Sequence, residues 1–188
     1  DLVSEFAARS ALDCVRTSGN VPVIKFRFVY RATPSLIRHL QYFYPDVTLV
    51  SMKKESEINP IECFTKDRKS RCALFAVEGK TKKSGNSKVN DAEITTLEHI
   101  INILRNSGYD EKDVMIISYY EAQRKVAEGV LPEGYEVLTV DSAQGREKRI
   151  VIVLTTRTSV PVDQGAFFSC PLRCNVAVSR HQEALIVL

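Results

Sequence analysis

The residues with the clearest chemical potential lie in two short stretches near the end of this 188-residue chain. Residues 139–157 read TVDSAQGREKRIVIVLTTR and form a polar Gln-Gly-Arg-Glu turn, ending at Glu147, before an apolar run; residues 175–180 read NVAVSR and end in Arg180. Arginine can bind phosphate oxygens in pairs and stays charged, and a carboxylate accepts hydrogen bonds. Each residue also has an ordinary alternative, because the turn could be structural and Arg180 could form a surface ion pair.

A second candidate is the segment EGKT at 78–81, which has the ending of a phosphate-binding P-loop, G-x-x-x-x-G-K-[ST]. The position five residues before Gly79 is Leu74, which lies in an apolar run and cannot supply the first glycine. We therefore reject a P-loop and interpret 80–90 as a basic, mobile loop. Its lysines could contact a phosphate backbone nonspecifically or simply be solvated: Lys80, Lys82, Lys83 and Lys88.

The elements that would position these residues are clearest after residue 90. Asn90 or Asp91 is expected to cap an amphipathic helix that runs to Arg105. Further on, the patterns predict a helix over 120–130 and strands over 113–118, 135–140, 149–156 and 183–188. Nearly continuous apolar strands separated by helices are typical of a mainly parallel sheet covered on both faces. The predicted fold class is α/β.

The first ninety residues give weaker patterns. Helical spacing over 1–18 predicts a helix, and Pro34 can open another that Pro45 ends. The remaining expectations are strands over 21–30, 47–51 and 72–79, the last of them buried, and a loop over 52–71.

Parallel α/β sheets bind ligands beyond the carboxyl ends of their strands. Three polar segments follow or adjoin predicted strands: Ser118–Gln123, Asp141–Glu147 and the loop before Asn175. We therefore expect all three along one functional edge of the sheet.

Length and composition favour one compact domain in a reducing, intracellular setting. The chain is 44% hydrophobic and 26% charged, with a net charge of +3. Its five cysteines make no regular framework and form no ligand pattern with the three histidines, so free thiols and no metal site are expected. No apolar run approaches the roughly 20 residues of a bilayer span. A nucleic-acid partner is permitted by the charge, and a membrane partner is not expected.

Five motifs in order resemble the C-terminal half of superfamily-one helicases, in the branch of the nonsense-mediated mRNA decay helicase. The two stretches above are similar to the branch's T-V-D-x-x-Q-G-x-E and N-V-A-[LM]-[ST]-R-A patterns. Upstream, FVYRATPSL resembles Q-Y-R-M-H-P, SKVNDAE resembles S-x-x-N-x-x-E-A, and IISYYEAQ resembles I-I-T-P-Y-x-x-Q. The resemblance covers residues from about 20 to 188.

The resemblance implies the second RecA-like domain of an ATP-dependent RNA or DNA helicase, a P-loop NTPase-type fold without its own P-loop. Residues 1–19 would be a helix or linker from a preceding domain, and 20–188 the domain itself. ATP with Mg²⁺ would be held mainly by a first RecA-like domain in the same chain. The expected partner is single-stranded RNA or DNA, and the expected state is a monomer that is inactive without the first domain.

The resemblance also implies roles for individual residues. Arg180 and Arg31 occupy the positions of arginine fingers on the γ-phosphate. Tyr30 would pack on adenine, although a core tyrosine is the alternative, and Glu147 would bind the ribose hydroxyls. Gln144 and Gly145 would couple the nucleotide site to the strand-binding surface. Nucleic-acid contacts would come from four further residues: Ser118, Tyr120, Gln123 and Thr139.

Some positions depart from the family pattern. Val29 replaces glutamine, Ala32 and Thr33 replace Met-His, Tyr119 replaces proline, and His181 and Gln182 replace Ala-[RK]. The loss of a polar side chain at Val29 leaves open an alternative: a degenerate helicase-like domain that serves as a non-enzymatic scaffold for nucleic acid or protein.

Overall fold

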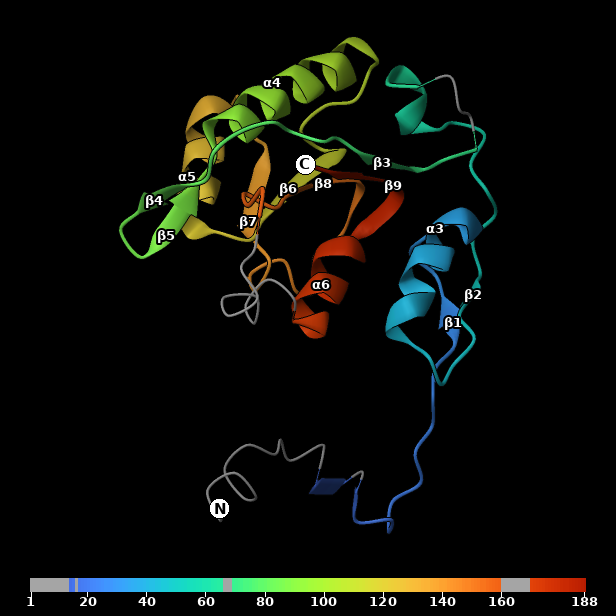
Figure 1. The fold of residues 1–188 in the computed structure, drawn as a ribbon. Helices are drawn as coiled ribbons and strands as arrows, with labels where there is room; N and C mark the ends of the chain where they lie inside the picture. Colours follow the sequence, from blue (N-terminus) through green and yellow to red (C-terminus); the bar gives the residue numbers. More distant parts are fainter. Residues whose placement is uncertain (1–13, 16, 66–68, 160–169) are drawn as a thin grey trace.

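The computed structural model describes residues 14, 15, 17–65, 69–159 and 170–188. Its centre is a parallel sheet of five strands within these residues, in the order β3-β9-β8-β6-β7 (Figure 1). The strands are β3 (Cys72–Leu74), β6 (Val114–Ser118), β7 (Glu136–Thr139), β8 (Lys148–Leu154) and β9 (His181–Val187). The α/β class with a mainly parallel sheet is confirmed.

The two middle strands pair in a continuous parallel register that runs from Val114↔Ile150 to Ser118↔Leu154. β6 is buried along its whole length, and so is β8 from Ile150 onward. Such strands need apolar side chains on both faces, which explains why their sequences read as unbroken Val/Ile runs.

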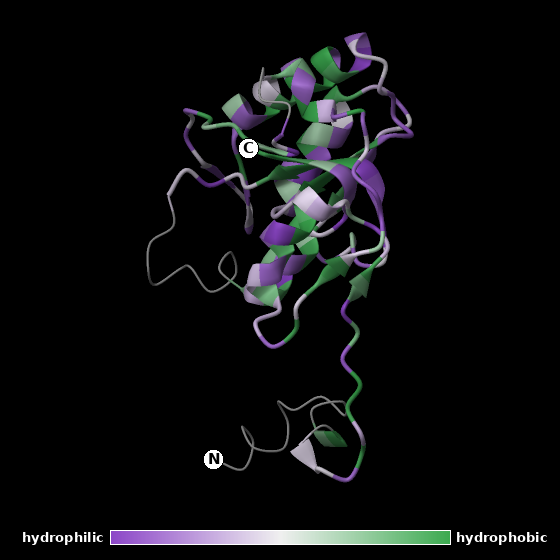
Figure 2. Cartoon of the chain, turned by 90° about the vertical axis from the view of Figure 1, so that its right-hand side faces the viewer, coloured by the Kyte–Doolittle hydropathy of each residue, from purple (hydrophilic) through white to green (hydrophobic). Residues whose placement is uncertain are grey.

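Helices cover both faces of this sheet. On one face, α4 (Asp91–Asn106) and α5 (Glu121–Val130) pack against alternate residues of the strands, including Ile116 and Ile152. On the other face, α6 (Pro171–Val178) packs through Ala177 against the intervening residues. Figure 2 shows the apolar strands enclosed between helices of mixed hydropathy, as an amphipathic arrangement requires.

The start of α4 is as predicted. The side chain of Asn90 accepts a hydrogen bond from the backbone N–H of Glu93 at 3.4 Å, which satisfies one of the free donors at the helix start. The apolar stripe of α4 is buried, as expected from its spacing: Ile94, Leu97, Ile100, Ile101 and Leu104.

A small unit lies beside the main sheet and consists of β1 (Phe28–Val29), α3 (Pro34–Leu40), the 3₁₀ turn η1 (Gln41–Phe43) and β2 (Val50–Ser51). β1 and β2 pair in parallel, and α3 packs through Leu36 and Ile37 on its own small core. A further 3₁₀ turn, η2 (Pro60–Cys63), lies near α4.

The strand predicted over 21–30 is wrong for most of its length, because only Phe28–Val29 forms one. Residues 21–27 have an irregular backbone, and Phe26 is 89% exposed. β-branched and aromatic residues form a strand only where a neighbouring strand and a packing surface are present. In 21–27 the described residues give such a neighbour only to Arg27, whose backbone oxygen accepts from the Val50 N–H at 2.8 Å.

Three other elements differ from what the sequence predicted. The loop predicted over 80–90 contains a hairpin of β4 (Lys82–Ser84) and β5 (Ser87–Val89). β3 is an edge strand with an exposed Leu74 rather than a buried strand. Helix α6 was not predicted, because its sequence PLRCNVAV has no clear apolar stripe.

The helix predicted over 1–18 lies almost entirely outside the described residues. Among the residues that the structure describes, no helix combines the length and the hydrophobicity needed to cross a bilayer.

Candidate functional site

Three charged residues meet at the amino ends of β8 and β9. Glu147 directly precedes β8, Arg180 directly precedes β9, and Arg31 follows β1. The Nε of Arg31 forms an ion pair with Oε2 of Glu147, and its Nη1 donates to the backbone oxygen of Ser179 at 3.0 Å. The structure therefore brings both arginines singled out from the sequence to the same end of the sheet as Glu147.

Two adjoining pockets open at this point. One of about 210 Å³ is lined by both Arg31 and Arg180, together with Phe26, Val29, Ala32, Leu40, Tyr44, Leu49 and Ser179. The other, of about 380 Å³, is open to solvent and is lined by Phe28, Val29, Tyr30, Arg31 and Glu147. Tyr30 is 70% exposed, so it is not the core tyrosine of the alternative reading. Arg31 belongs to both pockets and joins them.

The carboxylate of Glu147 is held from two sides. Arg31 binds one oxygen, and the Nε2 of Gln182 donates to the other at 2.9 Å. The hydrogen bond from Arg31 lowers the pKa of Glu147, and the bond from Gln182 acts in the same direction. Glu147 is therefore a fixed, ionised hydrogen-bond acceptor at neutral pH.

Arg180 lies within the electrostatic influence of both Arg31 and Glu147. Its Nε and Nη2 both donate to the hydroxyl of Ser179, at 3.1 and 2.5 Å, and among the described residues no carboxylate forms an ion pair with it. Burial lowers the pKa of Arg180, and the positive charge of Arg31 lowers it further. Glu147 offsets part of the repulsion between the two arginines, and the positive charge that remains in this partly desolvated pocket favours a bound anion.

The residues predicted to contact nucleic acid lie at the opposite edge. Because every strand of the sheet is parallel, Ser118 and Thr139 end their strands at the edge remote from Glu147 and Arg180. The prediction of one shared functional edge therefore holds for Ser118–Gln123, Asp141 and the residues just before Asn175, because Arg173 pairs with Asp141 and Tyr119 bonds Cys174, but it is wrong for Glu147. Residues 140–147 run back from the carboxyl end of β7 to the amino end of β8, so Glu147 belongs to the start of the next strand.

Two of those four residues are internal. Ser118 is 0% exposed, and its hydroxyl donates to the backbone oxygen of Tyr120 at 2.9 Å. Gln123 is also 0% exposed; its side chain bonds the backbone N–H and C=O of Asn90 at 2.8 and 3.1 Å and donates to Glu93 at 2.6 Å. Neither side chain can therefore contact a nucleic-acid strand in this conformation, which corrects the prediction that both residues bind nucleic acid.

The other two are partly exposed. Tyr120 precedes α5 as its N-cap residue, and the Thr139 hydroxyl lies 2.8 Å from that of Ser142. Tyr119, which stands at the family's proline, is buried and its hydroxyl donates to Cys174 Sγ at 3.4 Å. The Tyr119 ring packs on the core and is not available to stack with a nucleic-acid base.

Gln144 and Gly145 are exposed on the connection between the two edges. Gly145 has a φ of +81°, which a residue with a side chain would adopt only with strain. The structure places this turn between the edges but shows no hydrogen bond from Gln144 to Arg31, Glu147 or Arg180.

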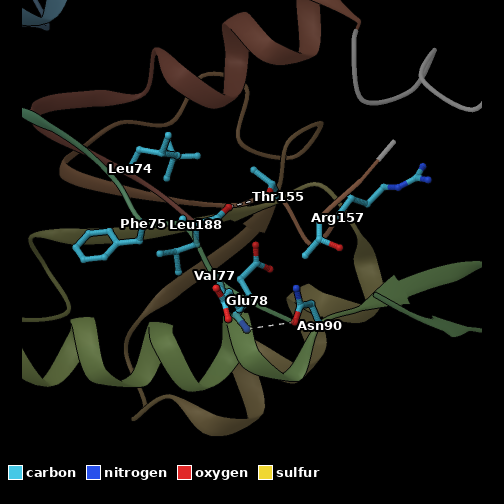
Figure 3. Close-up of a pocket in the computed structure, with 12 residues that line it drawn as sticks. Leu74, Phe75, Val77, Glu78, Asn90, Thr155, Arg157 and Leu188 are labelled. Carbon is cyan, nitrogen blue, oxygen red and sulfur yellow. Dashed lines mark hydrogen bonds between the residues drawn. The ribbon is translucent and has the colours of Figure 1, made fainter. Parts of the chain in front are cut away.

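Glu93 was not predicted as a site residue from the sequence, although it ends the SKVNDAE motif. Glu93 is 1% exposed, and its carboxylate accepts from the Thr156 backbone N–H at 2.8 Å and from Gln123. Burial raises its pKa to about 7. It also lines a pocket of about 310 Å³ at the carboxyl ends of β3, β8 and β9, together with Asn90, Glu78 and Arg157; the side chain of Arg157 points away from the other two (Figure 3). The S-x-x-N-x-x-E spacing was the available signal, because it places Asn90 and Glu93 together at one helix start.

Metal ligands do not cluster in the described part of the chain: no group of three or more His, Cys, Asp or Glu side chains there could hold an ion.

Comparisons with known proteins relate the chain to one family model and to proteins named as helicases. Residues 7–188 match a family model described as an AAA domain. A Caenorhabditis elegans protein named "Uncharacterized ATP-dependent helicase C05C10.2" is 28% identical over 175 residues, covering 89% of this chain and 11% of that protein. Mouse "Probable helicase senataxin" is 26% identical over 90% of this chain and 7% of its own length. "Regulator of nonsense transcripts 1" of Caenorhabditis elegans is 32% identical over 56% of this chain and 11% of its own length.

Among solved structures, the C-terminal domain of a possible DNA helicase from Lactobacillus plantarum WCFS1 aligns with a TM-score of 0.48 and 14% identity, over 84% of this chain and 85% of that one. The two helicase relatives that match about nine-tenths of this chain are much longer than it, and the chain covers only 11% and 7% of their lengths.

Proposed function

We propose that this chain, which belongs to the AAA-domain family, forms one half of an ATPase site. The premise is that the chain is the C-terminal RecA-like domain of a superfamily-one type helicase. In the proposal, the amino-end edge of the sheet faces ATP that a first RecA-like domain holds. Arg31 and Arg180 act on the γ-phosphate, and Glu147 and Tyr30 bind ribose and adenine.

The observation that carries this proposal is the convergence of Arg31 and Arg180 on one pocket. Phosphoryl transfer depends mainly on positioning and on positive charge around the transferring group. None of the described residues accepts a hydrogen bond from Nη2 of Arg31 or Nη1 of Arg180. Each guanidinium therefore keeps a donor group for a phosphate oxygen while its other nitrogens fix its position.

The neighbouring open pocket fits the nucleoside. Glu147 offers an ionised acceptor for ribose hydroxyls, and the exposed ring of Tyr30 offers a flat surface beside it. Mg²⁺ bound with ATP would neutralise phosphate charge; we propose that ligands outside this chain's described residues hold it. The chain's own contribution is cationic donors for the phosphates and an acceptor for the sugar.

A nucleic-acid strand is proposed to lie at the carboxyl-end edge. The N-terminus of α5 presents Tyr120 and Glu121 beside Thr139, and hydroxyls and backbone N–H groups at helix starts hold phosphates without reading bases. Ser118 and Gln123 position this edge from inside. Residues 140–147, with the Gln144–Gly145 turn, connect it to the nucleotide edge.

The second candidate is a non-enzymatic scaffold. The observation that favours it is Val29, whose apolar side chain lines both pockets at a position where the family has glutamine. A scaffold would retain strand or protein binding without ATP turnover.

ATP turnover of the whole protein and of this chain alone separates the two candidates. A motor domain predicts strand-stimulated turnover by the whole protein and none by the chain alone, since half of the cleft is then absent. Turnover by the isolated chain would contradict the shared-cleft proposal, and its absence from the whole protein would favour the scaffold.

A further inference from the structure

Residues 80–89, which we call the basic hairpin, form a charged surface that the proposed sites do not use. The segment contains β4 and β5, four lysines and no acidic residue. Lys82 forms an ion pair with Asp91. Among the residues that the structure describes, Lys80, Lys83 and Lys88 have no ion-pair partner.

The two strands of the basic hairpin place like charges opposite one another. In the antiparallel register, Lys83 pairs with Lys88, so both side chains project from the same face. Lys83 is exposed and Lys88 is half-buried. Directly opposed like charges destabilise a strand pair. An anion bound between them would remove that repulsion.

The basic hairpin is also fixed in place. The hydroxyl of Thr81 donates to the backbone oxygen of Thr156 at 2.9 Å, just beyond the end of β8. The hydroxyl of Ser87 accepts from the backbone N–H of Ala122 in the first turn of α5 at 3.0 Å. Gly85, with a φ of +58°, permits the two-residue turn at the tip. The lysines are therefore held on a short, anchored arm.

These anchors place the arm at the carboxyl-end edge of the sheet. Ser87 contacts the start of α5, which follows Ser118 and Tyr120, and Figure 1 shows the hairpin projecting beside α5 and β7. The lysines thus extend the edge where Tyr120 and Thr139 are partly exposed.

We propose that the basic hairpin binds the sugar–phosphate backbone of a nucleic-acid strand, with Lys83 and Lys88 as its principal contacts. The inference rests on the proposed function, because it extends the proposed strand-binding edge. Lysine is a flexible point charge, so the contact would add affinity and salt dependence without selecting a base sequence. The hairpin is a binding element and has no part in the chemical step.

Charge reversal tests the proposal. The affinity of the whole protein for a fluorescein-labelled single-stranded oligonucleotide is measured by anisotropy over a series of salt concentrations. Lys83→Glu/Lys88→Glu is expected to weaken binding and to flatten the slope of log K against log salt by about 1.4, since each phosphate contact on a single strand contributes about 0.7. Lys54→Glu/Lys112→Glu, which changes the charge equally at two exposed lysines elsewhere, is expected to change neither by a comparable amount.

A single substitution separates binding from folding. Lys88→Glu places opposite charges across the strand pair, so the melting temperature should be unchanged or higher while strand affinity falls. Strand affinity that falls only together with the melting temperature would overturn the inference. An equal loss in the control variant, or a double variant with wild-type affinity and slope, would also overturn it.

The outcomes distinguish a failure of the hairpin inference from a failure of the proposed strand-binding function. A wild-type protein that binds no single strand contradicts the proposed strand track, and the hairpin inference with it. A wild-type protein that binds strand while Lys83→Glu/Lys88→Glu binds equally well contradicts the hairpin inference alone. Unchanged strand affinity together with lost binding of a polyglutamate peptide would overturn it in favour of an acidic protein segment.

Discussion

The two ends of the parallel strands hold their polar side chains in different states. At the amino-end edge, Arg31 and Arg180 line a pocket and keep donor nitrogens that no described residue uses. At the carboxyl-end edge, Gln123 and Glu93 are buried and bonded to one another and to the backbone. The first arrangement leaves capacity for a ligand, and the second uses its capacity to hold α4, α5 and β8 together. At these two edges, the arginines keep donor groups for a ligand, whereas Gln123 and Glu93 are internal and bonded within the protein.

The largest expected effect comes from removing an arginine at the amino-end edge. Arg180→Ala in the whole protein should lower ATP turnover roughly 10³-fold, the magnitude typical of an arginine finger. Arg157→Ala is the matched control, because Arg157 lies at the carboxyl ends of the strands. Steady-state turnover with saturating strand measures both, and equal effects of the two variants would erase the proposed difference between the edges.

The edges should also differ in the sign of their pH dependence. Burial raises the pKa of Glu93 to about 7 from 4.5, so its contribution to stability is present below pH 4.5 and lost as the pH rises towards 7. Burial lowers the pKa of His181 to about 4 from 6.5, so its contribution is present above pH 6.5 and lost as the pH falls towards 4.

These two contributions, each about 3 kcal/mol at most, oppose one another between pH 4.5 and 6.5. Glu93→Gln should therefore leave a free energy of unfolding that rises with pH in this range, and His181→Gln one that falls. Urea unfolding at several pH values measures both slopes. Slopes of the same sign in the two variants would contradict the assignment.

Gln123 tests whether the carboxyl-end edge is internally bonded. Gln123→Leu removes two hydrogen bonds to the backbone of Asn90 and one to Glu93 Oε2, and it should lower the free energy of unfolding by about 2 kcal/mol. Gln144→Leu, at an exposed glutamine, should change it by less than about 0.5 kcal/mol. Were Gln123 instead a strand contact, the urea midpoint would stay constant while strand affinity fell.

The smallest expected effect concerns Thr139. Thr139→Val removes one hydroxyl at the carboxyl-end edge and should weaken strand binding by about 1 kcal/mol, the net worth of one hydrogen bond. The KM for ATP should stay unchanged because Thr139 lies at the edge remote from Glu147. An altered KM with unaltered strand affinity would reverse the assignment of the two edges.

Much of the fold could be predicted because burial dictates sequence directly. β6 and β8 are buried on both faces and so read as continuous apolar runs, and Asn90 caps α4 through local chemistry that the sequence displays. Residues 21–27 could not be predicted in the same way, because strand formation depends on a neighbour outside the segment.

The sequence identified three residues that the structure brings together, but not the geometry of the sheet edges around them. Motif order pointed to Arg31, Glu147 and Arg180, which the structure brings together. The edge predicted for Glu147 was wrong because the sequence alone does not show where a connection turns back to begin the next strand. Likewise, Ser118 and Gln123 look like surface polar residues in sequence, and only the packing of α4 and α5 shows that they are internal.

The most direct test is a double-mutant cycle of ATP turnover with Arg31→Ala, Arg180→Ala and the double variant in the whole protein. Two guanidinium groups that act on one phosphate should give a coupling free energy well above the 0.5 kcal/mol or so that independent sites show, with the double variant losing less than the product of the single losses. Losses that multiply as independent effects, or single variants that turn over ATP like the wild type, would contradict the account.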